Sequence, residues 1–308
     1  MEFRKNRGLT ARKVRRPWLT RACERLLLQM LPSAGDKVTR PLPAIPRRLL
    51  VVKVFGMGDG ILVRSIVEYL RKHHPEMRIG VLVGPATREV MTLSATFRVH
   101  QYVPQTLSVC SALRTLMDIR NCHYDAILNC EQRSLAGSAF LAATGAAYRL
   151  GFLPLGDTPK SWFLTHTVRF RDDQSVWQSF IHLARLIECS LPEALLPTPF
   201  QWSAEVERWA CNWWSEHIGA GRGPAIALHV GSQDREFSRW PVERFVELAE
   251  RTRIGIRELP VILTGTLPEK ELIRTFISRY SGHAIDASES GSLARTAALV
   301  KRCSLLVS

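Results

Sequence analysis

Short runs of apolar and β-branched residues alternate with helical patterns from Arg47 onward, and this alternation limits the possible fold more than any other feature of the sequence. Strands that follow one another through helices pair in parallel, because a parallel pair needs a long crossover connection. In the first repeat, residues 49–54 have the pattern of a buried strand, and residues 62–70 carry apolar side chains at helical spacing before Pro75. The sequence therefore predicts an α/β protein with parallel sheets.

The predicted elements form two groups, separated by a less periodic stretch that is richer in Pro and Trp. In the first group we predict strands at 49–54, 79–83, 99–103, 126–130 and 149–152, and helices at 62–70, 107–120 and 135–143. Helical patterns follow at 177–188 and 205–217. In the second group we predict strands at 225–230, 261–264, 284–287 and 305–307, and helices at 242–253, 269–280 and 292–301. The expected organisation is an N-terminal domain at 47–200, an interdomain segment at 201–223 and a C-terminal domain at 224–308.

The net charge of +14 is concentrated at the N-terminus, because residues 1–48 contain thirteen Lys and Arg against three acidic residues and so carry +10. Residues 18–31 have an amphipathic helical pattern. We predict that residues 1–46 form a basic arm and linker, and that residues 1–31 bind an anionic membrane surface. The alternative is a helix that packs on the protein body behind a solvated basic tail. Nucleic-acid binding is not expected, because base-stacking aromatic residues do not alternate with the basic ones.

Membrane-spanning and secretory segments are not predicted. No apolar run reaches the roughly 18 to 20 residues that cross a bilayer, and the N-terminus lacks the apolar core of a signal peptide. The sequence therefore predicts a cytoplasmic protein, with peripheral attachment to the inner face of the inner membrane if the arm binds lipid. The seven scattered cysteines have no C-x-x-C spacing, and no D-x-D or His/Asp cluster stands in the cleft segments, so neither a metal ion nor another cofactor is predicted.

A glycine-rich turn follows the first predicted strand and contains Gly56, Gly58 and Asp59. Such a turn places backbone N–H groups and a helix N-terminus beside a bound anion or sugar. The dinucleotide fingerprint requires a further glycine where Ile61 stands, so an NAD-dependent oxidoreductase is not predicted. An acid in this turn repels phosphate and suits a general base, although Asp59 could instead cap the following helix. Lys53 ends the strand and either lines the acceptor side or is a solvated or ion-paired terminus.

Four segments in the same order and spacing resemble glycosyltransferase family 9, the heptosyltransferases. The first is the run from Lys53 to Asp59, which resembles the family's K/R-x-S-S-x-G-D opening; Phe55 and Gly56 replace the usual serines. The other segments are Tyr124-Asp125-Ala126-Ile127-Leu128 with Ser138-Ala139, His229-Val230-Gly231-Ser232 with Arg239-Trp240-Pro241, and Thr264-Gly265 with Pro268-Glu269-x-Glu271-Leu272. Arg239 stands where lysine is common in the family. The resemblance extends from residue 47 to the end of the chain.

This resemblance implies two Rossmann-like domains with parallel sheets, the GT-B type. It further implies inverting transfer of a heptose or related sugar from a nucleoside-diphosphate sugar, ADP-heptose above all, to a lipid-linked glycan such as the lipopolysaccharide core. By the same resemblance Asp59 is the base that deprotonates the acceptor hydroxyl and Arg239 neutralises the diphosphate. The remaining implied site residues are Ser232 at a phosphate oxygen, Glu269 at a ribose hydroxyl and Thr264 elsewhere in the donor site. Lys53, Gly56 and Gly58 are expected on the acceptor side or in its loop.

The sequence ends at Ser308, where family members continue with a D-T/S-G-x-x-H loop. We therefore expect a second domain that lacks its last strands and one phosphate-binding loop. This leaves a second hypothesis open: a non-catalytic, membrane-associated binding protein that keeps the same fold.

Overall fold

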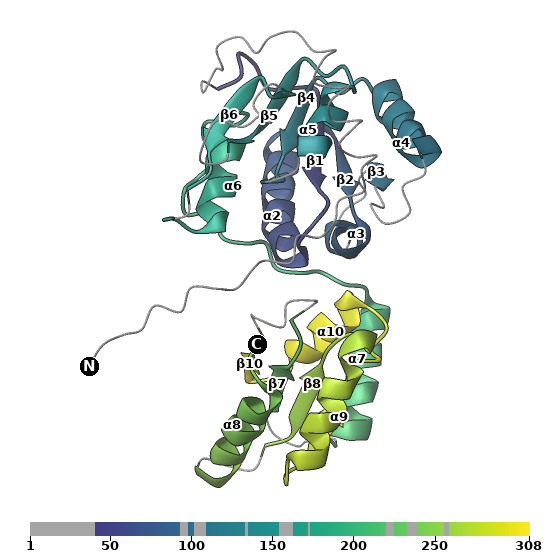
Figure 1. Cartoon of the computed structure of the whole chain (residues 1–308), viewed down its shortest axis with the longest axis vertical. Coiled ribbons are helices and arrows are strands. Elements are labelled where there is room, and N and C mark those ends of the chain that lie inside the picture. The colour runs from purple at the N-terminus through teal and green to yellow at the C-terminus, as the bar shows by residue number, and fades with distance from the viewer. Residues whose placement is uncertain are drawn as a thin grey trace, which may run out of the picture. The chain divides into compact units, whose positions relative to one another are not determined.

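Two parallel sheets organise the chain in the computed structural model (Figure 1). The structure describes residues 41–92, 98–101, 109–132, 135–153, 163–171, 173–219, 225–232, 239–255 and 259–308. Residues 1–40, which include the predicted arm helix at 18–31, lie outside the described residues. Within the described part of the chain, no helix is long and apolar enough to cross a membrane.

The larger sheet has the strand order β3-β2-β1-β4-β5-β6, and every neighbouring pair in it is parallel. Its strands are β1 (Arg48–Lys53), β2 (Arg78–Val83), β3 (Arg98–Gln101), β4 (Ala126–Asn129), β5 (Tyr148–Leu153) and β6 (His166–Arg169). The helices between and after these strands are α2 (Met57–His73), α3 (Pro85–Thr92), α4 (Val109–Asn121), α5 (Leu135–Ala142) and α6 (Val176–Ala184). This strand order is that of the Rossmann fold, in which the connections leave the central pair of strands in opposite directions.

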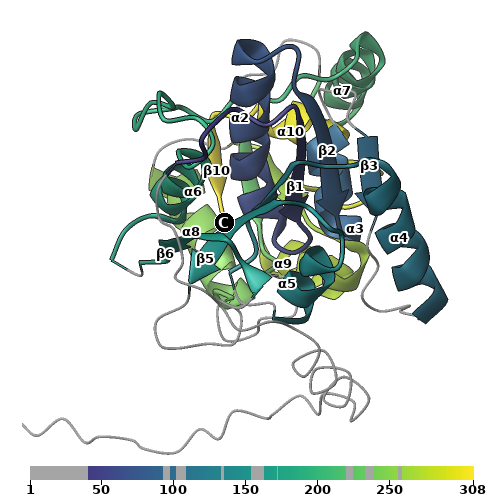
Figure 2. The ribbon, with the colours of Figure 1, turned by 90° about the horizontal axis from the view of Figure 1, so that it is seen from above.

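Both faces of the larger sheet are buried. Leu50 and Val52 belong to one core cluster, to which α4 contributes Ile119 and α5 contributes Leu141. The alternate residues of β1 are equally buried, and α2 packs against both β1 and α6. A parallel sheet covered by helices on both faces explains why its strands read as nearly continuous apolar runs. Both views also place α4 beside the edge strand β3 (Figures 1 and 2).

The smaller sheet has the order β10-β7-β8-β9 and is also parallel throughout. Its strands are β7 (Ile226–His229), β8 (Val261–Thr264), β9 (Ala284–Asp286) and β10 (Leu305–Val307). The helices that accompany it are α7 (Ala204–His217), α8 (Val242–Gly255), the short 3-10 helix η4 (Leu267–Glu269), α9 (Lys270–Arg279) and α10 (Leu293–Val300). The strands of this sheet are short, and all of them come from the predicted C-terminal domain.

Two core clusters cover the two faces of the smaller sheet. On one face, Val261 and Leu263 pack with Phe245 of α8 and Phe276 of α9. On the other face, Ile262 packs with α7 and α10. Four tryptophans pack against this second cluster, namely Trp202, Trp209, Trp213 and Trp214. The helical spacing of the last three in the sequence therefore reflects packing.

The described residues divide into two compact units, which we call unit 1 (41–85 and 98–196) and unit 2 (86–92 and 197–308). Most of the predicted interdomain segment at 201–223 is the helix α7, which packs within unit 2. The strand β6 and the helix α3 are absent from the sequence prediction. Both are short, and both mix apolar with polar and charged residues (HTVR in β6, PATREVMT in α3), so neither has a clear period.

Candidate functional site

The carboxyl ends of β1 and β4 form the topological switch point of the larger sheet, where α/β proteins bind ligands. Lys53 is the last residue of β1, and Asp59 lies in the first turn of α2, which follows it. Glu131 lies two residues beyond the end of β4. Three ionisable side chains from three segments of unit 1 thus meet at this edge, and we refer to them as the carboxylate–lysine cluster.

Lys53 lies between the two acids of this cluster. Its Nζ atom is 3.0 Å from Oδ2 of Asp59 and 3.6 Å from Oε1 of Glu131. The Lys53 side chain is only 3% exposed, whereas that of Asp59 is 34% exposed. Of the alternative prediction, a solvated or ion-paired strand terminus, the structure confirms the ion pair and not the solvation: this lysine is buried beside the ring of Phe180 on α6, 5.7 Å from its centroid. Asp59, in contrast, is accessible to a ligand while its position is held by a buried cation.

Gly56 starts the helix that carries Asp59. It is the N-cap of α2 and has a φ of +79°, a left-handed conformation that favours glycine. No side chain caps the helix by a hydrogen bond, so the alternative in which Asp59 serves as the N-cap is not observed. A Cβ atom at Gly56 would lie 3.3 Å from Oδ2 of Asp59, whereas one at Gly58 would meet nothing within 4 Å. Gly56 is therefore required by the turn, and Gly58 leaves open space beside it.

Glu131 is a site residue that sequence reasoning missed. Its Oε1 atom accepts hydrogen bonds from the backbone N–H groups of Val54, at 2.7 Å, and Phe55, at 2.9 Å. Glu131 therefore fastens the loop between β1 and α2, which carries Asp59, to the end of β4. The available signal was an acidic residue directly after a buried strand, next to the strand that bears Lys53.

In unit 2, the predicted donor residues gather around the carboxyl ends of the neighbouring strands β7 and β8. Thr264 ends β8 and is buried, and its Oγ1 atom is 3.2 Å from Nδ1 of His229, its partner on β7. Ser232 is half-buried and lies three residues beyond the end of β7. His229 thus has a hydrogen-bond partner in the sheet, and Ser232 and Thr264 lie at the edge where a ligand of unit 2 would bind.

Glu269 connects the loops that follow these two strands. Its Oε2 atom accepts hydrogen bonds from the backbone N–H of Thr266, at 2.7 Å, and from the Thr266 hydroxyl, at 2.8 Å, as part of a capping box at η4. Its carboxylate lies so close to Gly231 that a Cβ atom there would be 1.9 Å from Oε1. Glu269 is 7% exposed. One oxygen therefore shapes the loop, and the other faces the segment that leads to Ser232.

Arg239 lies just before α8. The ring of Trp240 packs against that of Phe245 at a centroid distance of 4.9 Å. This contact between residues on either side of the helix start is a hydrophobic staple, which sets the direction in which the chain enters the helix. Arg239 is half-buried, and no ion pair joins it to a carboxylate of the described residues. It is therefore a cation beside a helix N-terminus, an arrangement that suits a phosphate group.

The predicted site residues thus form two sets. Lys53, Gly56, Gly58 and Asp59 lie together in unit 1, and Ser232, Thr264, Glu269 and Arg239 belong to unit 2. Among the described residues, no group of three or more His, Cys, Asp and Glu side chains could hold a metal ion.

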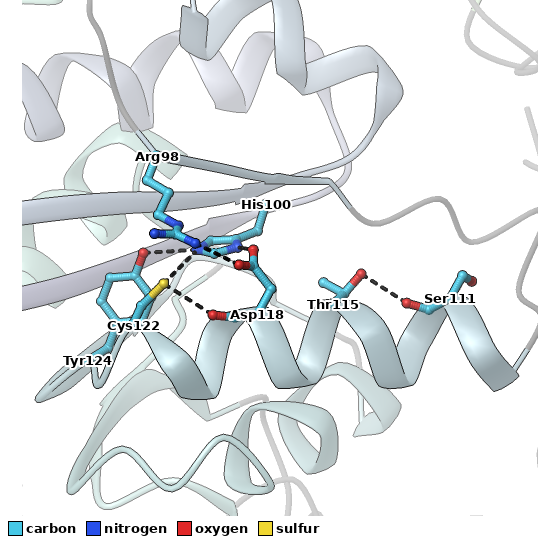
Figure 3. Close-up of polar contacts among 7 residues, drawn as sticks. All are labelled: Arg98, His100, Ser111, Thr115, Asp118, Cys122 and Tyr124. Atoms are coloured by element: carbon cyan, nitrogen blue, oxygen red, sulfur yellow. Dashed lines mark hydrogen bonds and ion pairs between the residues drawn. The ribbon is translucent and has the colours of Figure 1, made fainter.

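A second polar cluster lies on β3 and α4, at the outer edge of the larger sheet (Figure 3). Asp118 accepts a hydrogen bond from Arg98, at 2.7 Å, and contacts Nδ1 of His100. The other ring nitrogen of His100 is 2.9 Å from the hydroxyl of Tyr124. Burial lowers the pKa of His100, and this effect exceeds the opposing influence of Asp118. A neutral ring that donates from Nδ1 to Asp118 and accepts from Tyr124 fits these contacts, and it ties β3 to α4.

Comparison with known proteins decides the family. Residues 112–308 match the sequence model of glycosyltransferase family 9 (heptosyltransferase), which is more than half of the chain. This chain belongs to glycosyltransferase family 9. The matched segment contains the whole unit 2 set, from Ser232 to Glu269, and also Glu131, whereas Lys53 and Asp59 precede it. No curated protein matches the sequence.

Solved structures of a family 9 glycosyltransferase and of two heptosyltransferases share the fold of this glycosyltransferase. The family 9 glycosyltransferase from Veillonella parvula superposes with a TM-score of 0.72 at 20% identity, covering 87% of this chain and 77% of that one. E. coli ADP-heptose lps heptosyltransferase II gives 0.65 at 17% identity, with coverages of 84% and 78%. E. coli heptosyltransferase WaaC, solved with ADP, gives 0.60 at 16% identity, with coverages of 84% and 80%. The two parallel sheets are thus those of a GT-B-like glycosyltransferase.

Proposed function

We propose that this family 9 glycosyltransferase transfers a heptose or related sugar from a nucleoside-diphosphate sugar to a hydroxyl group of a lipopolysaccharide core or another envelope glycan. The observation that carries the proposal is the carboxylate of Asp59, which is partly exposed at the β1/β4 switch point and lies 3.0 Å from the buried ammonium of Lys53. An accessible carboxylate with a fixed position is what a general base requires.

In the proposed reaction, Asp59 takes the proton of the acceptor hydroxyl as the oxygen attacks the anomeric carbon. The bond from that carbon to the phosphate oxygen breaks on the opposite side, so the configuration inverts and the nucleoside diphosphate leaves. Arg239 stabilises the negative charge that develops on the leaving diphosphate, because a guanidinium binds phosphate oxygens in a bidentate manner. Neither a metal ion nor another cofactor is part of this proposal.

The donor is proposed to bind in unit 2. Ser232 and Thr264 supply hydroxyl groups at the ends of β7 and β8, and Glu269 supplies a carboxylate oxygen for a ribose hydroxyl. ADP-heptose is the proposed donor. Support comes from a heptosyltransferase of the same fold that was solved with ADP, and again with ADP-2-deoxy-2-fluoro heptose.

The substitution Asp59→Asn tests the role of the base. It keeps the size of the side chain and removes its basicity, so we expect kcat to fall by about 100-fold or more with little change in ADP affinity. Transfer is measured with ADP-heptose and a heptose-free core acceptor, and ADP binding by calorimetry. The matched control is Glu76→Gln, which changes an exposed acid of the same unit. Equal losses of transfer and ADP binding would contradict the role of Asp59 as the base.

The concentration of charge in residues 1–48 favours a membrane-related role beside or instead of transfer. We propose that residues 1–31 attach the protein to anionic lipid on the inner face of the inner membrane. The competing function is a membrane-associated binding protein without catalysis, which would neither transfer sugar nor hydrolyse the donor. Deletion of residues 1–46 tests the attachment: binding to vesicles that contain phosphatidylglycerol should be lost, and unchanged binding would exclude the arm.

A further inference from the structure

The carboxylate–lysine cluster contains one more acid than a base with a positioning lysine requires. We propose that Glu131 is a positioning residue that acts as the counter-ion of Lys53 when Asp59 takes up the acceptor proton. This inference rests on the proposed role of Asp59 and concerns what makes that proton transfer favourable. It assigns a task to the acid that lies beyond β4.

Lys53 is buried between the two acids of the cluster. This side chain is 3% exposed and contacts both acids, with Asp59 at 3.0 Å and Glu131 at 3.6 Å. A buried charge is stable only when it is paired, since water cannot replace the missing partner. Lys53 therefore depends on the nearby carboxylates throughout the reaction.

The charges around Lys53 change during transfer. The proton leaves the acceptor hydroxyl and joins Asp59, which becomes neutral, while Lys53 remains an ammonium ion. If Asp59 were the only partner of Lys53, proton uptake would leave a buried cation uncompensated and would be strongly opposed. Glu131 removes this obstacle, because Lys53 keeps an ion pair after Asp59 has been protonated.

Glu131 is itself held in place by hydrogen bonds to the backbone and to Asn129. Oε1 accepts the N–H groups of Val54 and Phe55, and the backbone N–H of Glu131 donates to Oδ1 of Asn129 at 3.1 Å. The ionisable side chains described at this site come from β1, from α2 and from the residues beyond β4, while α6 contributes the ring of Phe180. These bonds fix the position of Glu131. Its negative charge therefore stays beside Lys53 when Asp59 becomes neutral.

A purely structural role for Glu131 makes a different prediction. As an anchor, it needs only an oxygen that accepts two backbone N–H groups, and the amide of glutamine supplies one. Glu131→Gln therefore keeps the anchor and removes the charge. Lys53→Met removes the cation. The double variant, Glu131→Gln with Lys53→Met, removes both charges, so that protonation of Asp59 no longer leaves a buried ammonium ion without a counter-ion.

The experiment measures kcat and KM for these three variants with ADP-heptose and a heptose-free core acceptor. In Glu131→Gln, kcat should fall by about 100-fold, the scale of general-base catalysis, with KM nearly unchanged. The double variant should recover at least about tenfold in kcat relative to Glu131→Gln, because coupled groups are not additive.

A kcat of Glu131→Gln within about threefold of the parent value would overturn the inference, as would strict additivity of the two substitutions. These outcomes differ from a failure of the proposed function. If Asp59→Asn retains full transfer, Asp59 is not the base whatever Glu131 does; if Asp59→Asn is inactive and Glu131→Gln is fully active, only the role of Glu131 fails.

Discussion

The close approach of Glu269 to Gly231 leads to a sharp prediction for Gly231→Ala. A Cβ atom at this position would lie 1.9 Å from Oε1 and 2.1 Å from Cδ of Glu269, far inside van der Waals contact. The carboxylate must therefore move by roughly 1 Å or more, which takes its bonds to Thr266 beyond hydrogen-bond distance. Those bonds are 2.7 and 2.8 Å long and involve a buried, charged acceptor.

The magnitude follows from these two bonds. A hydrogen bond to a charged group contributes about 1.5–3 kcal/mol, and the displaced carboxylate regains part of that from water. We expect Gly231→Ala to destabilise unit 2 by about 2–4 kcal/mol. If the donor binds where we propose, ADP affinity should fall as well. Urea unfolding followed by tryptophan fluorescence measures the first quantity, because the four tryptophans of the second core cluster belong to unit 2.

A double-mutant cycle with Glu269→Ala isolates the clash. Once the side chain of Glu269 is removed, Gly231→Ala should reduce the free energy of unfolding by little more. The loss in the double variant should therefore be smaller than the sum of the two single losses by about 1 kcal/mol or more. Gly255→Ala is the control, since a Cβ atom there would meet nothing within 4 Å. Additive effects in the cycle, or a Gly231→Ala protein as stable as the control, would refute the reasoning.

Three further predictions concern other parts of the molecule. Gly80→Ala should destabilise unit 1 by about 2–3 kcal/mol in urea unfolding, because the new Cβ would lie 1.9 Å from the hydroxyl of Tyr124. Gly80→Ala combined with Tyr124→Ala should destabilise it by less than the sum of the two single substitutions. Burial lowers the pKa of His100 below its usual value of 6.5. The contribution of His100 to stability is therefore complete above pH 6.5 and is lost as the pH falls through its lowered folded-state pKa. A His100→Asn protein should show a smaller loss of unfolding free energy between pH 7.5 and 5. Arg239→Ala should lower kcat by about 100-fold, and Arg239→Lys should recover part of this loss because it restores the positive charge. An equal loss of kcat in both variants would mean that a positive charge at this position is not sufficient.

Much of the fold could be predicted from local sequence. Alternation of apolar runs and helical patterns was sufficient to predict β1, β2 and β4 of unit 1, and β8 and β10 have the predicted bounds. Periodicity and strand composition are properties of neighbouring residues, so they can be recognised without knowledge of the partners. The short elements β6 and α3 lacked such a pattern and became visible only in the tertiary structure.

The site divides in the same way. A glycine-rich turn that contains an acid is a local pattern, and this pattern together with the resemblance to family 9 identified Gly56 and Asp59 as candidates. The partners of Asp59 are not local: Glu131 lies 77 residues from Val54, whose backbone N–H it accepts, and Lys53 is buried against a ring on α6. Strand order brings these groups together, and strand order depends on how helices pack across the whole sheet. The sequence by itself therefore determined which acid stands in the turn, while the tertiary structure decided which charges surround it.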